Sequence, residues 1–232
     1  MRLDKFFSST ATLTRSQCQK QLKAGNITVN GVVVKKGDFQ INPEIDEIVF
    51  HNEKINYSKF IYIIMNKPQG VVSATNDERE KTVLDLLPPE MKRLGLFPCG
   101  RLDKDTTGLV ILTNDGTAAH NALSPKRRLE KKYFFTVADP YSDEDAATIE
   151  RGITLKDGYT TKPCRIERID DLSGYIYLTE GKYHEIKRLF GARRNRITVL
   201  DRVSFGKITL TDLPVGEWRY MSEEEIKNFL QV

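Results

Sequence analysis

Two carboxylates stand two positions apart in the segment CGRLDKDTTGLVILTNDG (Cys99–Gly116). Asp103 and Asp105 precede the apolar run Leu109–Leu112, which predicts a buried strand because it is bounded by Gly108 and an Asn-Asp-Gly turn. A loop beside a buried strand holds its side chains firmly, so an acid there can be aimed at a ligand. Aspartate is more often a turn-forming residue, and spacing alone favours that role for both acids.

A basic segment could supply the matching cation. The stretch GKYHEIKRLFGARRNR follows Glu180, and a helical projection separates it into an apolar side (Ile186, Leu189 and Phe190) and a basic side (His184, Lys187 and Arg188). The pattern alone favours a solvated basic face and a structural, hydrogen-bonding role for His184. The alternative is that the basic side faces a cleft and gives a cation to an acid there.

An aromatic run follows a basic loop in LEKKYFFTVA (Leu129–Ala138). Strand alternation places Phe134 on the face opposite to Tyr133 and Phe135. Core packing is the simpler interpretation for all three rings. Basic residues interleaved with an exposed ring are also how proteins hold an unstacked base, with charge for the phosphates and a ring for the base.

The positive charge of the chain is concentrated in three places, although the net charge is only +4. Residues 1–37 carry seven lysines and arginines against the single acid Asp4, an excess of six. The other two concentrations are Lys126–Lys132 and the five basic residues between Lys187 and Arg196. Three such segments in one chain make nucleic acid the leading class of partner.

The composition limits the remaining classes. The chain has 232 residues, of which 39% are hydrophobic, enough for one large or two modest domains. No segment approaches the ~20 apolar residues of a membrane span, and the N-terminus lacks the apolar core of a signal peptide. Its cysteines (Cys18, Cys99 and Cys164) and histidines (His51, His120 and His184) show no disulfide or metal-ligand spacing. We therefore expect a cytoplasmic protein without a metal site.

The elements that must position these groups fall into two parts. Thr14 and Gln17 have capping-box spacing and Gly25 suits a C-terminal stop, which predicts a short helix. Asn30-Gly31 predicts a tight hairpin between residues 27–29 and 32–34. We expect this small module to occupy residues 1–50 and a polar linker to cover residues 51–59.

Residues 60–232 alternate short strands with short helices, and no internal repeat is present. The expected strands are Phe60–Met65, Gly108–Thr113, Lys132–Ala138, Cys164–Ile169, Tyr175–Thr179 and Ile197–Val203. The expected helices are Val83–Leu87, Gly116–Leu123, Asp143–Arg151, His184–Ala192 and Glu223–Leu230. The irregular connections favour an α+β fold with a mixed, mainly antiparallel sheet flanked by helices.

Several motifs together carry a family resemblance over nearly the whole chain. GRLDKDTTGL (Gly100–Leu109), EKKYFF (Glu130–Phe135) and GKYHEIKRLF (Gly181–Phe190) resemble the three motifs of the RsuA-type family of ribosomal RNA pseudouridine synthases. NKPQGVVSA (Asn66–Ala74) adds a match ahead of the first motif. The N-terminal module, with RLDKFFS and AGNITVNGVVV, is similar to an RNA-binding domain of ribosomal protein S-four type.

The resemblance implies roles for particular side chains. Asp103 stands at the family's catalytic aspartate, which acts on a flipped-out uridine either at the anomeric carbon or by removing the proton of the neighbouring carbon. Asp105 has no such implied role. Tyr133 matches the tyrosine that stacks on uracil, and Arg101 matches the arginine that fills the gap left by the base. The resemblance implies no cofactor and no metal.

Electrostatics explains why the catalytic aspartate needs a basic partner. Burial under RNA would raise the pKa of a catalytic carboxylate unless a cation lies within about 4–6 Å. Lys187 matches the family's basic partner, and a lysine–aspartate attraction at 4 Å is of order 4 kcal/mol at an effective dielectric of 20. Two departures stand out, because Glu185 occupies a position where many members have glutamine and Lys187 one where many have arginine.

We therefore expect an isomerase acting on one uridine of small-subunit (16S) ribosomal RNA, or of an assembly intermediate, and working as a monomer. The small-subunit target rests on DTTGL, LSPKRR and YHEIKRLF. The alternatives are a sibling enzyme for large-subunit (23S) RNA and a non-catalytic RNA-binding assembly factor. The expected catalytic residues are Asp103, Tyr133 and Lys187. The expected RNA contacts are Arg101, Arg188, Lys126, Arg127, Arg128, Arg2, Arg15, Lys20 and Lys23.

Overall fold

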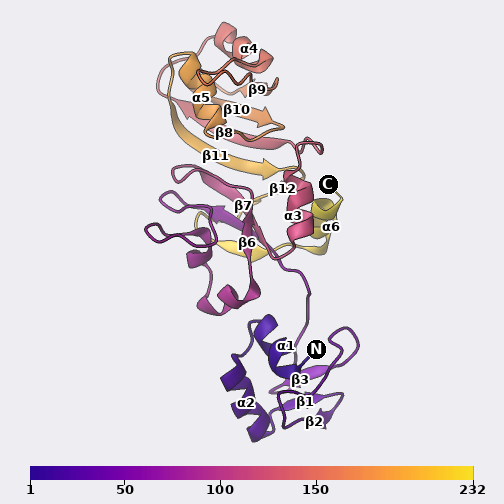
Figure 1. Ribbon diagram of the computed structural model, residues 1–232. Helices are drawn as coiled ribbons and strands as arrows, with labels where there is room; N and C mark the ends of the chain where they lie inside the picture. Colours follow the sequence, from indigo (N-terminus) through magenta and orange to yellow (C-terminus); the bar gives the residue numbers. More distant parts are fainter. Residues whose placement is uncertain (232) are drawn as a thin grey trace. The chain divides into compact units, whose positions relative to one another are not determined.

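The computed structural model describes residues Met1–Gln231, and the chain divides into two compact units (Figure 1). The smaller unit contains Met1–Ile61 and Leu87–Leu96. The larger unit contains Tyr62–Leu86 and the chain from Phe97 onward. Among the described helices, none has the length and apolar character that crossing a membrane would require.

The smaller unit packs two helices on a small sheet. Its helices are α1 (Leu3–Ser9) and α2 (Arg15–Ala24), and its strands are β1 (Ile27–Val29), β2 (Val32–Val33), β3 (Ile48–Phe50) and β4 (Glu53–Lys54), in the order β2-β1-β3-β4. Thr14 and Gln17 form the predicted capping box of α2, and Gly25 ends this helix with φ +79°. The predicted hairpin is also confirmed, since Val29 pairs with Val32 across Asn30-Gly31.

Several short elements of the smaller unit did not follow from sequence periodicity. Helix α1 was not predicted, because it is only seven residues long; it forms because Leu3, Phe6 and Phe7 are fully buried in the core of this unit. Within the expected linker, strand β4 pairs with β3, and Ile55 and Tyr57 pack against the same core. The short η2 (Pro89–Leu94) also belongs to this unit.

The larger unit is built on one nine-stranded sheet. Its strands are β5 (Tyr62–Lys67), β6 (Phe97–Cys99), β7 (Thr107–Thr113), β8 (Lys131–Val137), β9 (Arg165–Arg168), β10 (Ser173–Leu178), β11 (Ile197–Phe205), β12 (Ile208–Thr209) and β13 (Trp218–Tyr220). The main path is β13-β5-β7-β11-β8-β10-β9, and every strand pair except β7–β11 is antiparallel. The predicted α+β class with a mainly antiparallel sheet is confirmed, whereas the short β6, β12 and β13 were not predicted.

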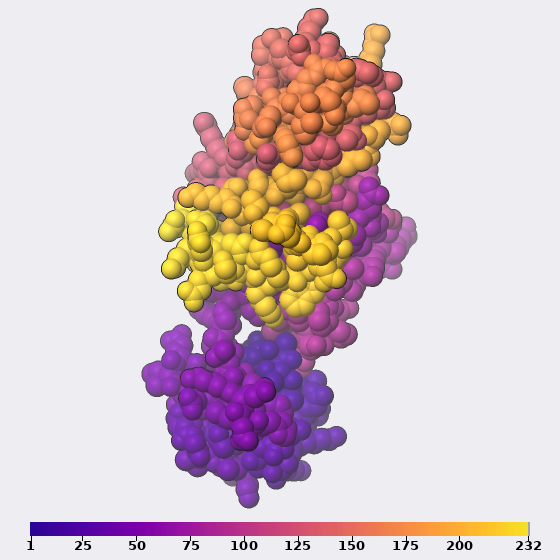
Figure 2. Space-filling model, turned by 180° about the vertical axis from the view of Figure 1, so that it is seen from behind, coloured from indigo at the N-terminus to yellow at the C-terminus, as the bar shows by residue number. Residues whose placement is uncertain are grey.

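Helices cover the two halves of this sheet. They are η1 (Val83–Leu86), α3 (Gly116–Leu123), α4 (Asp143–Arg151), α5 (Glu185–Ala192) and α6 (Glu223–Leu230). Helices α4 and α5 lie beside the half that holds β8–β11, and α3 and α6 lie beside the other half (Figure 1). The C-terminal residues, yellow in Figure 2, form a continuous part of the surface of this unit. The segment from Val83 is a 3₁₀ turn rather than the expected α-helix.

The two halves of the sheet meet at the parallel pair β7–β11, where Thr107 pairs with Asp201 and Gly108 with Arg202. A Cβ atom at Gly108 would lie 2.4 Å from the Arg202 carbonyl oxygen, and the residue has φ +101°. Only glycine permits this approach without strain. Gly108, which precedes the buried run in the sequence, therefore allows β7 and β11 to pair and so joins the two halves of the sheet.

Candidate active site

The loop between β6 and β7 carries Asp103, and buried contacts fix its backbone. Lys67, which is fully buried, donates from Nζ to the carbonyl oxygens of Thr106 at 2.7 Å and Lys104 at 3.3 Å. Ser73 donates from Oγ to the Leu102 carbonyl at 3.1 Å and accepts from the Leu102 amide at 3.1 Å. The segment around Asn66–Ala74 therefore positions the loop that carries Asp103.

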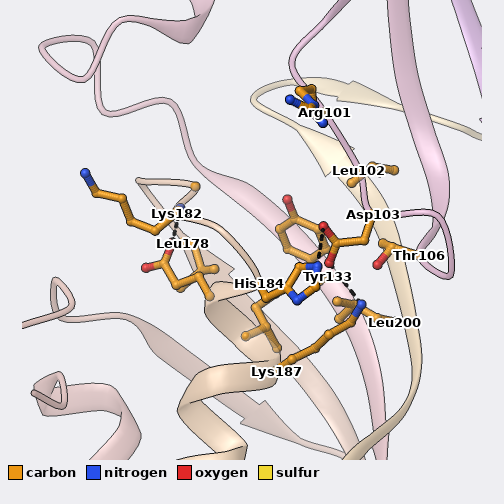
Figure 3. Close-up of a pocket in the computed structure, with 13 residues that line it drawn as sticks. Arg101, Leu102, Asp103, Thr106, Tyr133, Leu178, Lys182, His184, Lys187 and Leu200 are labelled. Carbon is orange, nitrogen blue, oxygen red and sulfur yellow. Dashed lines mark hydrogen bonds and ion pairs between the residues drawn. The ribbon is translucent and has the colours of Figure 1, made fainter. Parts of the chain in front are cut away.

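Lys187 is bonded to two acids of this loop. Its Nζ atom lies 2.9 Å from Asp103 Oδ2 (Figure 3). The same atom lies 2.5 Å from Asp105 Oδ1. The side chains of Asp103 and Lys187 are 29% and 23% exposed, whereas that of Asp105 is 69% exposed. The predicted proximity of Asp103 and Lys187 is thus present in the structure.

These contacts shift the pKa values of Lys187 and Asp105. Burial opposes the charged form of Lys187, but its hydrogen bonds to Asp105 and Asp103 raise its pKa above the usual value. The same hydrogen bond from Lys187 lowers the pKa of Asp105. The lysine is therefore a permanent cation at neutral pH, bonded to Asp103 in the pocket wall and to the more exposed Asp105.

Helix α5 presents Lys187 because of its two-sided pattern. Ile186, Leu189 and Phe190 are buried, and the Phe190 ring packs on Phe135 of β8 with centroids 4.8 Å apart. Lys187 therefore faces away from this contact, toward Asp103. The predicted division of the helix into an apolar and a basic side is confirmed.

His184 precedes α5 in a left-handed conformation, φ +48°. Its Nε2 atom lies 3.5 Å from Asp103 Oδ1, and its ring stacks on Tyr183 with centroids 3.9 Å apart. The histidine thus borders the catalytic candidate.

A small pocket of about 80 Å³ surrounds Asp103. Its wall includes Tyr133, His184, Lys187 and the buried residue Thr106. Tyr133 is 8% exposed and lies on β8, and Figure 3 shows its ring beside the Asp103 carboxylate. As predicted from alternation, Tyr133 and Phe135 are buried and Phe134 is on the opposite, partly exposed face. The pocket has the chemical parts of a site for an unstacked base.

Glu185, where many family members have glutamine, also borders the pocket and is a buried acid. It is 4% exposed, and Oε2 accepts from the Lys182 amide at 2.7 Å while Oε1 has no partner in the described chain. Burial, together with nearby Glu180, raises the pKa of Glu185 to about 7. Glu185 is the first residue of α5, and its bond to the Lys182 amide keeps the carboxylate against the start of the helix.

The other expected RNA contacts have different surroundings. Arg101 lies at the edge of the pocket, is exposed and has no ion pair in the described chain. Arg188 is bonded to Asp157 at 2.5 Å, and Arg2 to Asp4 at 2.7 Å. The remaining candidates are exposed: Lys126, Arg127, Arg128, Arg15, Lys20 and Lys23.

Sequence reasoning missed three residues of the site. Asp105 was interpreted as a turn residue, and the contact of its carboxylate with Lys187 requires the fold. Lys67 lies within the segment that resembles the family, but its type gave no sign that it would be buried. Thr106, 2% exposed with an unpartnered Oγ1, could have been found from its position three residues after Asp103.

No group of three or more histidine, cysteine or acidic residues suited to a metal ion occurs within Met1–Gln231.

Comparison with known proteins gives consistent matches. Residues 61–192 match the model of the RNA pseudouridylate synthase family, and residues 1–45 match the S4 domain. An uncharacterized RNA pseudouridine synthase of Bacillus subtilis (strain 168) is 42% identical over 97% of both chains.

Named relatives extend over the same length. Ribosomal small subunit pseudouridine synthase A of Haemophilus influenzae is 38% identical over 100% of both chains. Its counterpart from Escherichia coli (strain K12) is 37% identical over 97% of this chain and 98% of its own. A crystal structure of a pseudouridylate synthase, 37% identical, superposes with a TM-score of 0.70 and covers 99% of each chain.

Proposed function

Because this chain belongs to the RNA pseudouridylate synthase family, we propose that it converts one uridine of small-subunit ribosomal RNA into pseudouridine. Relatives with the name of small-subunit synthases match the chain along its full length, including the S4 region. The basic segments supply the charge that RNA requires. The observation that carries the catalytic assignment is the ion pair of Asp103 with Lys187 in a pocket beside Tyr133.

The reaction rearranges one nucleotide. The bond between N1 of uracil and C1′ of ribose breaks, the base turns, and a bond forms between C5 and C1′. C5 loses its proton and N1 gains one, so no oxidant, reductant or energy source is required. Asp103 begins the reaction as a carboxylate, either by attack on C1′ or by removal of the C2′ proton. Lys187 supports both routes because it stabilises the charged form in a pocket that RNA closes to water.

The neighbouring residues hold the base. The ring of Tyr133 lies beside Asp103, where it stacks on the extruded uracil. Arg101 is exposed, has no competing acid in the described chain and lies at the edge of the pocket, so it is available to enter the gap in the RNA stack. Filling that gap offsets part of the few kcal/mol that unstacking costs.

The smaller unit binds structured RNA through α2 and its surroundings. Arg15, Lys20 and Lys23 are exposed there without ion pairs in the described residues. Each phosphate contact made by such a cation releases counterions from the RNA. In this proposal the protein works as a monomer in the bacterial cytoplasm, where its ribosomal substrate is assembled.

Mapping of pseudouridines in a gene-deletion strain tests the proposal. One uridine of 16S RNA should remain unmodified after deletion, and the wild-type gene should restore it. The variant Asp103→Asn should fail to restore it, whereas Asp212→Asn, which alters an exposed aspartate outside the pocket, should succeed. A site lost from 23S RNA would contradict the target, and restoration by D103N would contradict the catalytic role.

A further inference from the structure

A second, larger pocket adjoins the pocket of Asp103. Its volume is about 620 Å³, and it shares Arg101, Tyr133, Gly181 and Lys182 with the smaller pocket. Asp103 and Lys187 do not line it. Its walls come from the loop after α3 and from strands β8 and β11. It therefore opens beside the position of the reacting base without containing the catalytic pair.

The wall of this second pocket is strongly positive. It includes five basic residues and one acid: Arg101, Lys131, Lys162, Lys182, Arg202 and Glu180. None of the five cations forms an ion pair with a described residue, in contrast to Arg168, Arg193 and Arg219, which are bonded to acids elsewhere in the chain. A concentration of unpaired cations in a concave wall is complementary to an anion.

Glu180 does not neutralise these cations. Its Oε2 accepts from the Tyr159 hydroxyl at 2.5 Å, and its Oε1 accepts from the Lys162 backbone amide at 2.7 Å. Its carboxylate is therefore held by an uncharged hydroxyl and a backbone group. No basic side chain lies within ion-pair distance of it in the described chain.

Arg202 gives an independent sign of a missing ligand. It is 2% exposed, and its Nε donates to the Leu109 carbonyl at 2.7 Å, but Nη2 is buried with no hydrogen-bond partner in the described chain. An unpaired buried donor is costly, and a charged one more so. The Phe205 ring, 5.3 Å from the guanidinium carbon, offsets only part of this cost.

Lys131 reinforces the demand for negative charge. Its Nζ has two long contacts with carbonyl oxygens, 3.3 Å to Leu129 and 3.5 Å to Glu180. Burial and the nearby guanidinium of Arg202 lower the pKa of Lys131. A bound anion would oppose this shift by stabilising the charged form of Lys131, and it would pair with both cations.

We propose that the pocket around Arg202 and Lys131 binds a phosphodiester of the RNA substrate that flanks the reacting uridine. This inference rests on the proposed function, because it takes the uridine to lie beside Asp103. Before the reaction the uracil in that position is joined to its ribose, and the ribose is joined to the adjacent phosphates, so a phosphate lies nearby. The pocket that adjoins the same Tyr133 ring offers the required cations.

The test measures the affinity of a substrate RNA fragment as a function of salt concentration. In Lys131→Met, the dissociation constant at ~0.15 M salt should rise roughly tenfold and the salt slope should fall by about one. Turnover at saturating RNA should stay within about threefold of wild type. Lys156→Met, which removes an exposed lysine outside both pockets, should leave the affinity, slope and turnover unchanged.

Two further measurements separate the possible outcomes. Arg202→Lys and Arg202→Met should differ in salt slope if the charge binds phosphate, and K131M keeps the test open if R202M does not fold. Inorganic phosphate at constant ionic strength should compete with RNA for the wild type more than for K131M.

Phosphate binding with unchanged RNA affinity in K131M would overturn the RNA assignment. An unchanged salt slope in an active K131M enzyme would overturn the phosphate site. If the wild type forms no pseudouridine but K131M lowers the slope, the proposed reaction fails and the phosphate site stands.

Discussion

Lys187 Nζ lies 2.9 Å from Asp103 Oδ2, although the two residues are 84 positions apart. The same ammonium is 2.5 Å from Asp105, so one cation serves two acids. Asp105 is the more exposed of the two, and solvent already stabilises its charge. The cation therefore matters most for Asp103, which RNA would enclose.

Replacement of Lys187 should affect chemistry more than binding. In Lys187→Met the two acids lose their shared cation, and we expect kcat to fall at least about a hundredfold. The Kd for RNA should change less than about threefold, because the lysine is directed at acids and not at solvent. Asp105→Asn is the matched control, since it leaves the Asp103 pair intact and should keep kcat within about threefold. Equal losses of kcat and affinity in K187M would identify a phosphate contact instead.

Thr106 should contact the substrate through its buried hydroxyl. Thr106→Val removes an unpartnered polar atom, so the free protein should be equally stable or more stable by about 1 kcal/mol in urea unfolding. Its kcat/KM should nevertheless fall about tenfold, because the substrate loses a hydrogen bond. Thr106→Ser keeps the hydroxyl and should retain most activity. A T106V enzyme with wild-type kcat/KM would refute the contact.

Glu185 should make stability depend on pH. Its pKa is raised from 4.5 to about 7, so the folded protein retains a proton that the unfolded chain loses. The free energy of unfolding should therefore decrease as pH rises from about 4.5 to 7 and stay reduced above that range, by on the order of 3 kcal/mol. Glu185→Gln should abolish this decrease and should be the more stable protein at pH 8. Parallel pH profiles for the two proteins in urea unfolding would contradict this prediction.

Lys67 should have the opposite dependence. Burial is the main cause that lowers its pKa from 10.5 to about 8, with Asp105 and Asp103 opposing the shift. Between about pH 8 and 10.5 the unfolded chain holds the proton that the folded protein has released. This residue therefore raises the free energy of unfolding with pH across that window, by about 3 kcal/mol.

Lys67→Met isolates the effect of this lysine. The difference in unfolding free energy between wild type and K67M should grow in favour of wild type from pH 8 to 10. At pH 7 the variant should lose about tenfold in kcat, because Asp103 sits on a loop that Lys67 holds. Lys81→Met, at an exposed position, is the control. A constant difference across this pH range would show that Lys67 keeps its proton.

Local patterns in the sequence predicted most of the regular elements. The hairpin at Asn30-Gly31, the buried strand at Leu109–Leu112 and the capping box of α2 each depend on a few adjacent residues. The unpredicted elements are short and gain their stability from tertiary partners, not from their own periodicity. They are α1, β3, β4, η2, β6, β12 and β13.

The site divides in the same way. Tyr133 and Lys187 could be chosen because their motifs resemble a family, and strand or helix periodicity oriented them. The triangle of Lys187 with Asp103 and Asp105, the burial of Glu185 and the unpartnered groups of Thr106 and Arg202 depend on contacts between distant segments. No local pattern contains that information, because each contact brings together residues from different strands and loops.

The parallel pairing of β7 with β11 determines whether the reactive groups can meet at all. Asp103 precedes β7, whereas Tyr133 lies on β8 and Lys187 on α5, which packs against β11 in the other half of the sheet. A slip of one residue along this junction, about 3.3 Å, would exceed the length of the bond between acid and amine. Gly108 thus sets the register between the two halves of the sheet. Gly108→Ala should abolish the reaction by displacing Asp103 relative to Lys187, although it alters no reacting atom.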